Sequence, residues 1–425
     1  MIENEEKKIE SALIVGVVHR DQPLLQVNDF LDELELLAET AGAEVKERLI
    51  QRRDRIDPAF MLGRGKIEEL AQMVKYNNAD VIIFDDDLSP AQVKNIQEVC
   101  KIKIIDRSAL ILDIFAKHAR TRESRTQVEL AQLNYLLPRL TRQWTHLSRQ
   151  VGGIGVRGPG ETQLEIDRRL VRKRISVLEQ ELIKITSQRD TRRKRRRDTF
   201  KIALVGYTNV GKSTLLNTLT DSDILVQDQL FATLDPTVRS LQLNLYQVLL
   251  IDTVGFIRKL PHHLVASFKS TLEETKYADM LMHVVDISNH NWKEQMHTVM
   301  GVLGEMQADK KPVLTVFNKI DLVKDVGLMK SIRNSYPDSL FISAKRGINL
   351  PELCNTLEDF ISHSFQRMDF SIPVQRSDIV AQLHNLGKVL SLDYSGNDAH
   401  ISLLTSKDKV GRIQRLVNFD KNRDR

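Results

Sequence analysis

One stretch decides the fold of the central part of this chain: Gly206-Tyr207-Thr208-Asn209-Val210-Gly211-Lys212-Ser213-Thr214. The apolar run 202–205 before it predicts a buried strand, and the leucines at 215, 216 and 219 are spaced as one face of a helix. A strand, a GxxxxGKS loop and a helix form a phosphate-binding P-loop, whose two glycines let backbone N–H groups curl around a phosphate at the helix N-terminus. We therefore predict that Lys212 contacts the β- and γ-phosphates and that the Ser213 hydroxyl binds Mg²⁺.

Two further motifs follow in the order that a nucleotide-binding domain requires. Asp252-Thr253-Val254-Gly255 follows a predicted strand and has the form DxxG, in which the carboxylate reaches Mg²⁺ through water and the glycine N–H meets the γ-phosphate. Asn318-Lys319-Ile320-Asp321 has the form NKxD. Asp321 can accept from the N1–H and 2-amino groups of guanine, whereas adenine would leave this carboxylate unpaired. The sequence therefore predicts GTP or GDP, with Ser343-Ala344-Lys345 as another base-contacting loop.

A threonine between the P-loop and DxxG should close on Mg²⁺ when the γ-phosphate is present. The stretch reads Phe231-Ala232-Thr233-Leu234-Asp235-Pro236-Thr237, and we choose Thr233 over Thr237. The predicted catalytic residues are Lys212, Thr233 and Gly255, and the predicted Mg²⁺ ligands are Ser213 and Thr233. The predicted nucleotide-binding residues are Gly206, Tyr207, Thr208, Asn209, Val210, Gly211, Lys212, Ser213, Thr214, Phe231, Ala232, Thr233, Leu234, Asp235, Asp252, Thr253, Val254, Gly255, Asn318, Lys319, Asp321, Ser343, Ala344 and Lys345.

The residue after DxxG departs from the Ras-like pattern. In those proteins it is a glutamine that orients the attacking water, whereas here it is Phe256. A phenyl ring cannot orient water, so we expect slow hydrolysis unless a partner, a potassium ion or another residue supplies the missing group. His262 and His263 lie just downstream, and we interpret them as surface residues rather than catalysts.

Composition places the chain among ordinary globular proteins. Its 425 residues are enough for about three domains, with 41% hydrophobic and 28% charged residues. The polar N-terminus gives no secretory signal, and no apolar run reaches the ~18 residues of a membrane span. Cys100 and Cys354 fall in separate predicted domains without metal-ligand spacing, so we expect reduced thiols. We predict a cytoplasmic protein and leave a peripheral position at a membrane open.

The basic charge is concentrated in one segment. Residues 120–197 contain 20 Lys or Arg and 8 Asp or Glu, a formal charge of +12, so the remainder of the chain carries −7. This excess favours contact with a nucleic-acid backbone. The alternative is a solvated helical face, although acidic partners are too few to balance it.

Residues 11–119 alternate strand and helix patterns. Predicted strands at 12–18, 45–50, 81–84 and 102–105 interleave with predicted helices at 30–37, 67–74, 91–99 and 109–116. This alternation predicts a small parallel sheet covered by helices. Gly63-Arg64-Gly65-Lys66 lacks the full P-loop spacing, and we favour a turn that begins a helix.

The basic segment predicts two long helices. Apolar side chains step by three and four at 130, 133, 137, 140, 144 and 147, and again at 171, 175, 178, 182 and 185. The two helices should fold back as an antiparallel hairpin, the second spanning about residues 162–196 and roughly 50 Å. Pro138 should kink the first.

A glycine-rich loop, residues 152–160, should form the tip of this hairpin. It contains GxGxxG, but a helical pattern precedes the match, whereas the dinucleotide fingerprint needs a preceding strand. Thr162-Gln163-Leu164-Glu165 is a capping box that begins the second helix. The tip is either a mobile loop or a backbone-rich probe for an RNA crevice, and glycine content does not decide between them. We favour phosphate contact over a solvated linker for the basic run 192–197.

The predicted fold class is α/β. A small parallel α/β domain (1–119) precedes the antiparallel hairpin (120–198), a P-loop GTPase domain (199–366) with a closing helix at 351–365, and a small α+β domain (367–425). The tail pattern predicts a strand, a helix, two strands and a helix, and we see no chemistry in it. We interpret it as an accessory domain that docks on a partner or on the GTPase domain.

The chain resembles the HflX family of bacterial GTPases over essentially its whole length. The resemblance is carried by residues 106–115 (DRSALILDIF), 127–133, 144–147 (WTHL), 152–169 (GGIGVRGPGETQLEIDRR), 206–214, 229–237 (QLFATLDPT) and 252–258 (DTVGFIR). It implies binding to the large (50S) ribosomal subunit, hydrolysis stimulated by the ribosome, and a role in splitting stalled ribosomes or in ribosome biogenesis. The hairpin would then reach ribosomal RNA near the peptidyl transferase centre. Some members are reported to use ATP through the N-terminal region, where this chain has no second P-loop.

Three functions stay open at this stage. The leading hypothesis is a monomeric, ribosome-associated GTPase that binds with GTP and leaves after hydrolysis. The second is a nucleotide-driven RNA-remodelling or assembly factor. The third is a signalling switch that binds only protein effectors, which predicts that neutralising residues 192–197 leaves function intact.

Overall fold

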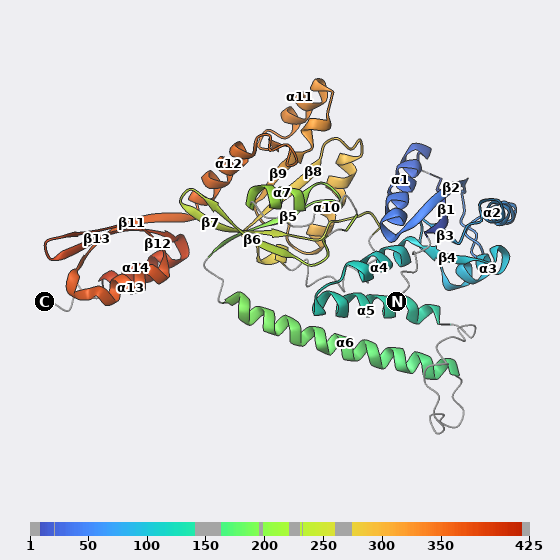
Figure 1. Cartoon of the computed structure of the whole chain (residues 1–425), viewed down its shortest axis with the longest axis horizontal. Coiled ribbons are helices and arrows are strands. Elements are labelled where there is room, and N and C mark those ends of the chain that lie inside the picture. The colour runs from blue at the N-terminus through green and yellow to red at the C-terminus, as the bar shows by residue number, and fades with distance from the viewer. Residues whose placement is uncertain are drawn as a thin grey trace, which may run out of the picture.

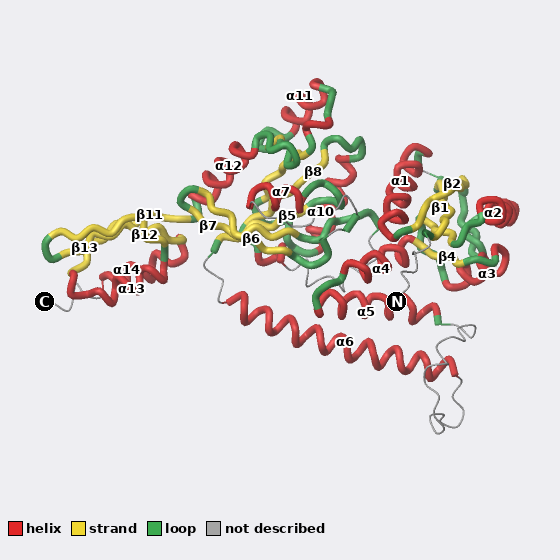
Figure 2. Tube along the Cα trace, viewed as in Figure 1, coloured by secondary structure: helices red, strands yellow, loops and turns green. Residues whose placement is uncertain are grey.

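The computed structural model describes residues 9–20, 22–140, 163–194, 199–220, 230–231, 233–259 and 274–418. These residues form an elongated molecule (Figure 1). An α/β part at one end and a helical hairpin flank a central six-stranded part, and a small three-stranded part lies at the other end. Figure 2 shows that helices cover both larger sheets.

The first part is a parallel sheet in the order β2-β1-β3-β4. Alternate residues of β1 face opposite sides: Leu13 and Val15 pack with α2 and α3, whereas Ala12 and Ile14 pack with α1 and α4. Coverage on both faces explains why these strands are almost uniformly apolar. All eight predicted elements are present, and Arg64 begins a helix as expected. Their bounds are β1 (Glu10–Val18), α1 (Leu24–Ala41), β2 (Ala43–Arg52), α2 (Arg64–Asn77), β3 (Val81–Phe84), α3 (Pro90–Cys100), β4 (Lys103–Asp106) and α4 (Arg107–His118).

Two antiparallel helices follow, α5 (Arg122–Leu136) and α6 (Gln163–Lys194), and they lie side by side in Figure 1. Ion pairs join Arg122 to Glu181 and Arg174 to Glu129, so the first helix runs against the second. The prediction of a kink at Pro138 was wrong. The α-helix ends at Leu136, and a 3₁₀ turn (Leu137–Arg139) takes up the proline, which cannot donate the next helical hydrogen bond. The capping-box threonine and the glycine-rich loop lie outside the described residues.

The central part is a six-stranded sheet in the order β10-β9-β8-β5-β7-β6, parallel except for the edge strand β6. The P-loop leaves the carboxyl end of β5, a central strand, where open parallel sheets bind ligands. The bounds are β5 (Phe200–Val205), α7 (Lys212–Thr220), β6 (Thr237–Leu243), β7 (Tyr246–Asp252), β8 (Met280–Asp286), α10 (Trp292–Glu305), β9 (Val313–Asn318), α11 (Val326–Ser335), β10 (Leu340–Phe341) and α12 (Leu350–Ser362).

The last part has the predicted order of a strand, a helix, two strands and a helix. Its antiparallel sheet runs β11-β13-β12, with bounds β11 (Phe365–Pro373), α13 (Ser377–Leu386), β12 (Lys388–Ser395), β13 (Asp398–Ser406) and α14 (Val410–Asn418). The predicted closing helix 351–365 was too long: α12 ends at Ser362, because Phe365 pairs with Ser406 in the new sheet. Contacts from Phe365 to Tyr246 and from Lys388 Nζ to the Leu245 carbonyl (3.1 Å) attach this part to the central sheet. Among the described residues, no helix is long and apolar enough to cross a membrane.

Candidate nucleotide site

The P-loop curls because three of its residues have positive φ. The values are 155° at Gly206, 57° at Asn209 and 93° at Gly211. A Cβ atom at position 206 would lie 2.3 Å from the Val284 carbonyl oxygen, and one at 211 would lie 2.4 Å from Asn318 Nδ2. Only glycine fits at these two positions, so the motif spacing has a steric cause as well as a phosphate-binding one.

Lys212 lies in the centre of the loop and is 7% exposed. Its Nζ donates to the carbonyl oxygens of Gly206 (3.1 Å) and Tyr207 (2.7 Å). Burial lowers the pKa of this ammonium to about 8, although the nearby Asp252 acts to raise it. A buried ammonium satisfied only by carbonyl oxygens is well placed to bind an anion.

Ser213, Thr233 and Asp252 converge beside the P-loop. Ser213 Oγ donates to Asp252 Oδ2 at 2.6 Å and lies 2.9 Å from Thr233 Oγ1. The other oxygen of Asp252, Oδ1, is buried and has no hydrogen-bond partner among the described residues. Burial raises the pKa of Asp252, and the charge of Lys212 opposes that rise. Two hydroxyls and a carboxylate with an unfilled oxygen form a donor set that suits Mg²⁺. Thr237, the alternative ligand, is instead the first residue of β6.

The base-contacting motifs are held together by Asn318. Its Nδ2 donates to the Val210 carbonyl (2.8 Å), and its Oδ1 accepts from the Ala344 N–H (2.9 Å). One side chain therefore joins the P-loop to the 343–345 loop. Lys319 is paired with Asp286 (2.7 Å), whereas Asp321 is exposed at the end of this stretch.

The DxxG glycine packs directly against the P-loop. A Cβ atom at Gly255 would lie 2.8 Å from Thr208 Cα. The next residue, Phe256, donates its N–H to the Gly206 carbonyl (3.1 Å) and accepts from the Thr208 N–H (2.8 Å). Its side chain is 2% exposed and belongs to the core. The phenyl ring that replaces glutamine is thus a packing residue.

Comparisons with known proteins agree with this geometry. Three family models match: "GTP-binding GTPase N-terminal" at residues 28–116, "GTP-binding GTPase Middle Region" at 118–196, and "50S ribosome-binding GTPase" at 201–319. A GTPase HflX from Caldanaerobacter subterraneus subsp. tengcongensis is 45% identical over 96% of this chain and 94% of its own. The chain belongs to the HflX family of GTPases. A GTPase HflX from Flavobacterium psychrophilum is 52% identical over 76% of this chain and 78% of its own.

A solved structure is also similar to this HflX-family chain. It is a GTP-binding protein from the hyperthermophilic archaeon Sulfolobus solfataricus in complex with GDP, 25% identical, with a TM-score of 0.45, covering 84% of this chain and 99% of that one. Family membership establishes GTP as the substrate and hydrolysis as the reaction.

Part of the predicted nucleotide-binding stretch 231–237 contacts the N-terminal half of the chain. Phe231 packs edge-on against Phe115 of α4, with ring centroids 4.6 Å apart. Asp235 accepts from the Thr121 hydroxyl at 2.6 Å. Because these side chains are occupied by the N-terminal half, their predicted contact with nucleotide could come only from the backbone. Several other predicted positions lie outside the described residues: Ala232, His262, His263, and residues 144–147, 152–160 and 195–197.

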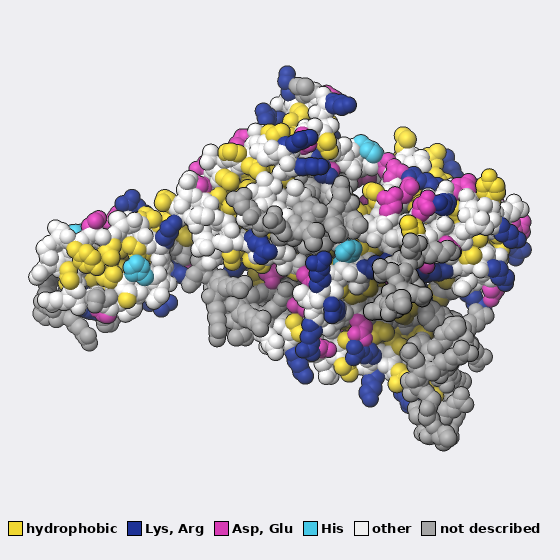
Figure 3. Space-filling view, viewed as in Figure 1, with side chains coloured by type: hydrophobic (Ala, Val, Ile, Leu, Met, Phe, Trp, Pro, Cys, Tyr) yellow, Lys and Arg dark blue, Asp and Glu magenta, His cyan; other side chains and the backbone are white. Residues whose placement is uncertain are grey.

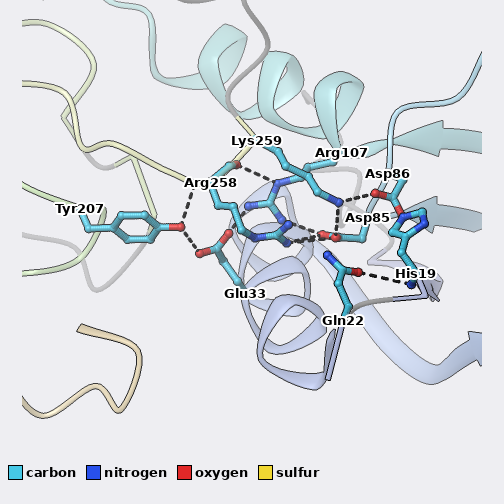
Figure 4. Close-up of polar contacts among 9 residues, drawn as sticks. All are labelled: His19, Gln22, Glu33, Asp85, Asp86, Arg107, Tyr207, Arg258 and Lys259. Atoms are coloured by element: carbon cyan, nitrogen blue, oxygen red, sulfur yellow. Dashed lines mark hydrogen bonds and ion pairs between the residues drawn. The ribbon is translucent and has the colours of Figure 1, made fainter. Parts of the chain in front are cut away.

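A charged cluster joins the N-terminal sheet to the nucleotide domain, and sequence reasoning missed it. Figure 4 shows that Arg107 lies between Glu33 of α1 and Asp85, which follows β3. Arg258, three residues after Gly255, reaches both oxygens of Asp85 at 3.0 Å. Lys259 pairs with Asp85 (3.2 Å) and with Asp86. A signal existed: the run Asp85-Asp86-Asp87 and Arg107 follow predicted parallel strands, where charged side chains meet at one sheet edge.

Tyr207 of the P-loop belongs to the same cluster. Its hydroxyl donates to Glu33 Oε2 (2.5 Å) and accepts from the Arg258 N–H (2.8 Å) (Figure 4). Burial acts to raise the pKa of Asp85, but the charges of Arg107, Arg258 and Lys259 outweigh it and hold that pKa below its ordinary value. The P-loop and the residues after DxxG are therefore tied to one carboxylate cluster of the N-terminal sheet.

The hairpin presents a basic surface. Figure 3 shows Lys and Arg side chains gathered over α5 and α6. The exposed cations of α6 within the described residues are Arg169, Arg172, Lys173, Arg174 and Lys184. Arg174 pairs with Glu129 of α5. The sequence of this helix, residues 163–194, contains 10 Lys or Arg and 5 Asp or Glu, so it carries +5 of the +12.

Proposed function

We propose that this HflX-family GTPase hydrolyses Mg²⁺–GTP at the P-loop site, with activity stimulated by the large ribosomal subunit. The unfilled Oδ1 of Asp252, beside the hydroxyls of Ser213 and Thr233, carries the Mg²⁺ part of the proposal. Ser213 and Thr233 would hold the ion directly, and Asp252 would hold it through water. When bound, Mg²⁺ would neutralise charge on the β- and γ-phosphates.

The protein's own groups would supply the remaining stabilisation. Lys212 would exchange its two carbonyl partners for phosphate oxygens. The negative charge of the phosphates would stabilise the protonated form of Lys212, which burial disfavours. The Gly255 N–H would donate to the γ-phosphate, and Asp321 would read guanine. Because Phe256 is buried in the core, no group at its position would orient the attacking water. Slow hydrolysis until a partner binds is the expected consequence.

The proposed partner is the large ribosomal subunit, with ribosomal RNA contacted by the basic hairpin. Two observations support it: residues 201–319 match a family described as 50S ribosome-binding GTPase, and α6 exposes five cations among the residues whose burial is described. Lys and Arg on a long helix release counterions when they neutralise RNA phosphates. We further propose a cytoplasmic monomer that acts in splitting or rescue of stalled ribosomes or in ribosome biogenesis.

The test combines hydrolysis with binding. GTP turnover would be measured with and without large subunits for the wild type, for R172Q/K173Q on α6, and for the matched control R412Q/R415Q on α14, where two exposed arginines are also neutralised. We expect strong stimulation of the wild type. The α6 variant should need more subunit for half-stimulation and should lower the salt slope of binding by about 1.5, while the control should match the wild type.

Two outcomes would change the assignment. Equal turnover with and without subunits would contradict the ribosomal proposal and favour a protein-effector switch. Stimulation by protein-free structured RNA, with strand separation, would favour the alternative of a nucleotide-driven RNA-remodelling factor.

A further inference from the structure

Thr208 occupies an unusual position in the P-loop. It is 6% exposed, lies two residues after Gly206, and packs against Gly255, where a Cβ atom would approach its Cα to 2.8 Å and its Cγ2 to 2.9 Å. It also lines a cavity of about 270 Å³ between the P-loop, α1 and α10. The residue thus lies where the P-loop meets the DxxG glycine.

The backbone of Thr208 is not free to bind phosphate. Its N–H donates to the Phe256 carbonyl at 2.8 Å, and the neighbouring Gly206 carbonyl accepts from the Phe256 N–H. These bonds form a short parallel bridge between the P-loop and the segment after DxxG. Any polar contact that Thr208 donates to the nucleotide must therefore come from its side chain.

The Thr208 hydroxyl is buried and has no hydrogen-bond partner among the described residues. Nearby hydroxyls differ: Ser213 donates to Asp252, Thr253 to the Leu204 carbonyl (2.6 Å), and Tyr207 to Glu33. An unsatisfied buried hydroxyl costs about 1–3 kcal/mol, so its retention in a ligand site points to a partner that arrives with the ligand. Asp252 Oδ1, the other unfilled oxygen here, has Mg²⁺ as its proposed partner.

We propose that the Thr208 hydroxyl donates a hydrogen bond to the γ-phosphoryl group of GTP and so contributes to the discrimination of GTP from GDP. GDP lacks that group and leaves the hydroxyl unpaired. The inference rests on the proposed nucleotide site and assigns its terminal-phosphate contact. It gives the P-loop a side-chain donor at a position where the main-chain donor is already used.

The test measures equilibrium binding of GDP and of the slowly hydrolysed analogue GTPγS, both with Mg²⁺ and without ribosomes. T208V removes the hydroxyl at nearly constant volume, and T208S keeps it. The matched control is T298V, because Thr298 lines the same cavity but its hydroxyl already donates to the Glu294 carbonyl at 2.9 Å. We expect T208V to weaken GTPγS relative to GDP by about 10- to 100-fold, with T208S and T298V close to the wild type.

Thermal unfolding without nucleotide separates this role from a structural one. Because the hydroxyl has no hydrogen-bond partner among the residues that the structure describes, T208V should unfold at the wild-type temperature or above it. An unchanged GTPγS-to-GDP ratio in T208V would overturn the inference, even if turnover fell, since the hydroxyl would then act on water. A destabilised T208V would also overturn it. Failure of the wild type to bind GTPγS would instead contradict the nucleotide site itself.

Discussion

The N-terminal sheet and the central sheet meet at the carboxyl ends of their parallel strands, where Arg258 contacts Asp85. The polar groups at these two edges differ in whether they have hydrogen-bond partners. The edge of the central sheet holds Lys212, whose hydrogen bonds among the described residues go to backbone carbonyls, and an oxygen of Asp252 that has no partner among those residues. At the edge of the N-terminal sheet, both oxygens of Asp85 accept from Arg258, and Arg107 and Lys259 complete the cluster. The first edge is open to a ligand, and the second is filled by side chains.

The difference teaches how to judge a sheet edge as a binding site. Open parallel sheets commonly bind ligands at their carboxyl ends, so topology alone would nominate both edges. The carboxylates separate them: Asp252 keeps one oxygen without a hydrogen-bond partner among the described residues, whereas both oxygens of Asp85 accept from Arg258. Nε and Nη1 of Arg258 are also buried without a hydrogen-bond partner among those residues, but its guanidinium stacks on the Phe30 ring. The carboxyl edge of the N-terminal sheet binds the segment that follows DxxG, because Arg258 and Lys259 pair with Asp85. The acidic residues at this edge therefore serve the contact between the two sheets rather than a second nucleotide site.

The largest effect is expected from removing a buried cation at the carboxyl edge of the N-terminal sheet. Arg107 is 1% exposed and pairs with Glu33 and Asp85. R107M would leave the buried Asp85 and the partly buried Glu33 short of a cation and should lower the free energy of unfolding by about 3–5 kcal/mol. Urea denaturation checks this. A loss below about 1 kcal/mol would mean that the charges around Arg107 are screened by solvent rather than buried.

The next largest effect is expected from removing Lys212 at the carboxyl edge of the central sheet. K212A removes the cation that we propose for the β- and γ-phosphates, so GTP turnover should fall about 10²- to 10³-fold. Single-turnover hydrolysis at saturating GTP measures it. Unlike R107M, this variant should not lose stability in the absence of nucleotide, because a desolvated charge has been removed. If K212A were less stable than the wild type without nucleotide, Lys212 would be a stabilising residue like Arg107, and the proposed difference between the two sheet edges would be wrong.

A smaller effect comes from the titration of Lys212. Its folded pKa of about 8 lies below its ordinary value of 10.5 because burial disfavours the charged form. The unfolded chain therefore binds this proton more tightly, and stability without nucleotide should rise as pH increases from about 8 to 10, by on the order of 2 kcal/mol. Comparing denaturation of the wild type with K212M isolates this contribution. Parallel pH profiles for the two proteins would show that Lys212 is not responsible.

The smallest effect concerns the rim of the filled edge. Lys259 pairs with Asp85 and Asp86, but its side chain is 37% exposed. K259A should therefore cost less than about 1 kcal/mol of stability, and the loss should shrink further in high salt. Denaturation midpoints at low and high salt provide the measurement. A loss as large as that of R107M would place Lys259 in the buried core of the interface.

Local patterns predicted most of the fold. The strand at 81–84 was located to the residue, and the order of the tail elements was correct. The spacing of apolar residues indicates which face of a helix or strand is buried, so the element can be predicted from residues that are close in sequence. The errors arose where distant contacts decide the outcome: α12 ends early because Phe365 pairs with Ser406, and α5 ends before Pro138 instead of bending there.

The sequence by itself determined the nucleotide class, the order of elements and the basic hairpin, because contiguous motifs and residue spacing encode them. Only the tertiary structure decided which sheet edge is open, that Phe256 is a core residue, and that the Thr208 hydroxyl lacks a hydrogen-bond partner in the described part of the chain. Asp85 and Arg258 are 173 residues apart in the chain and meet only when two domains dock. Such pairings have no local pattern, since they depend on the satisfaction of charges and hydrogen bonds across an interface.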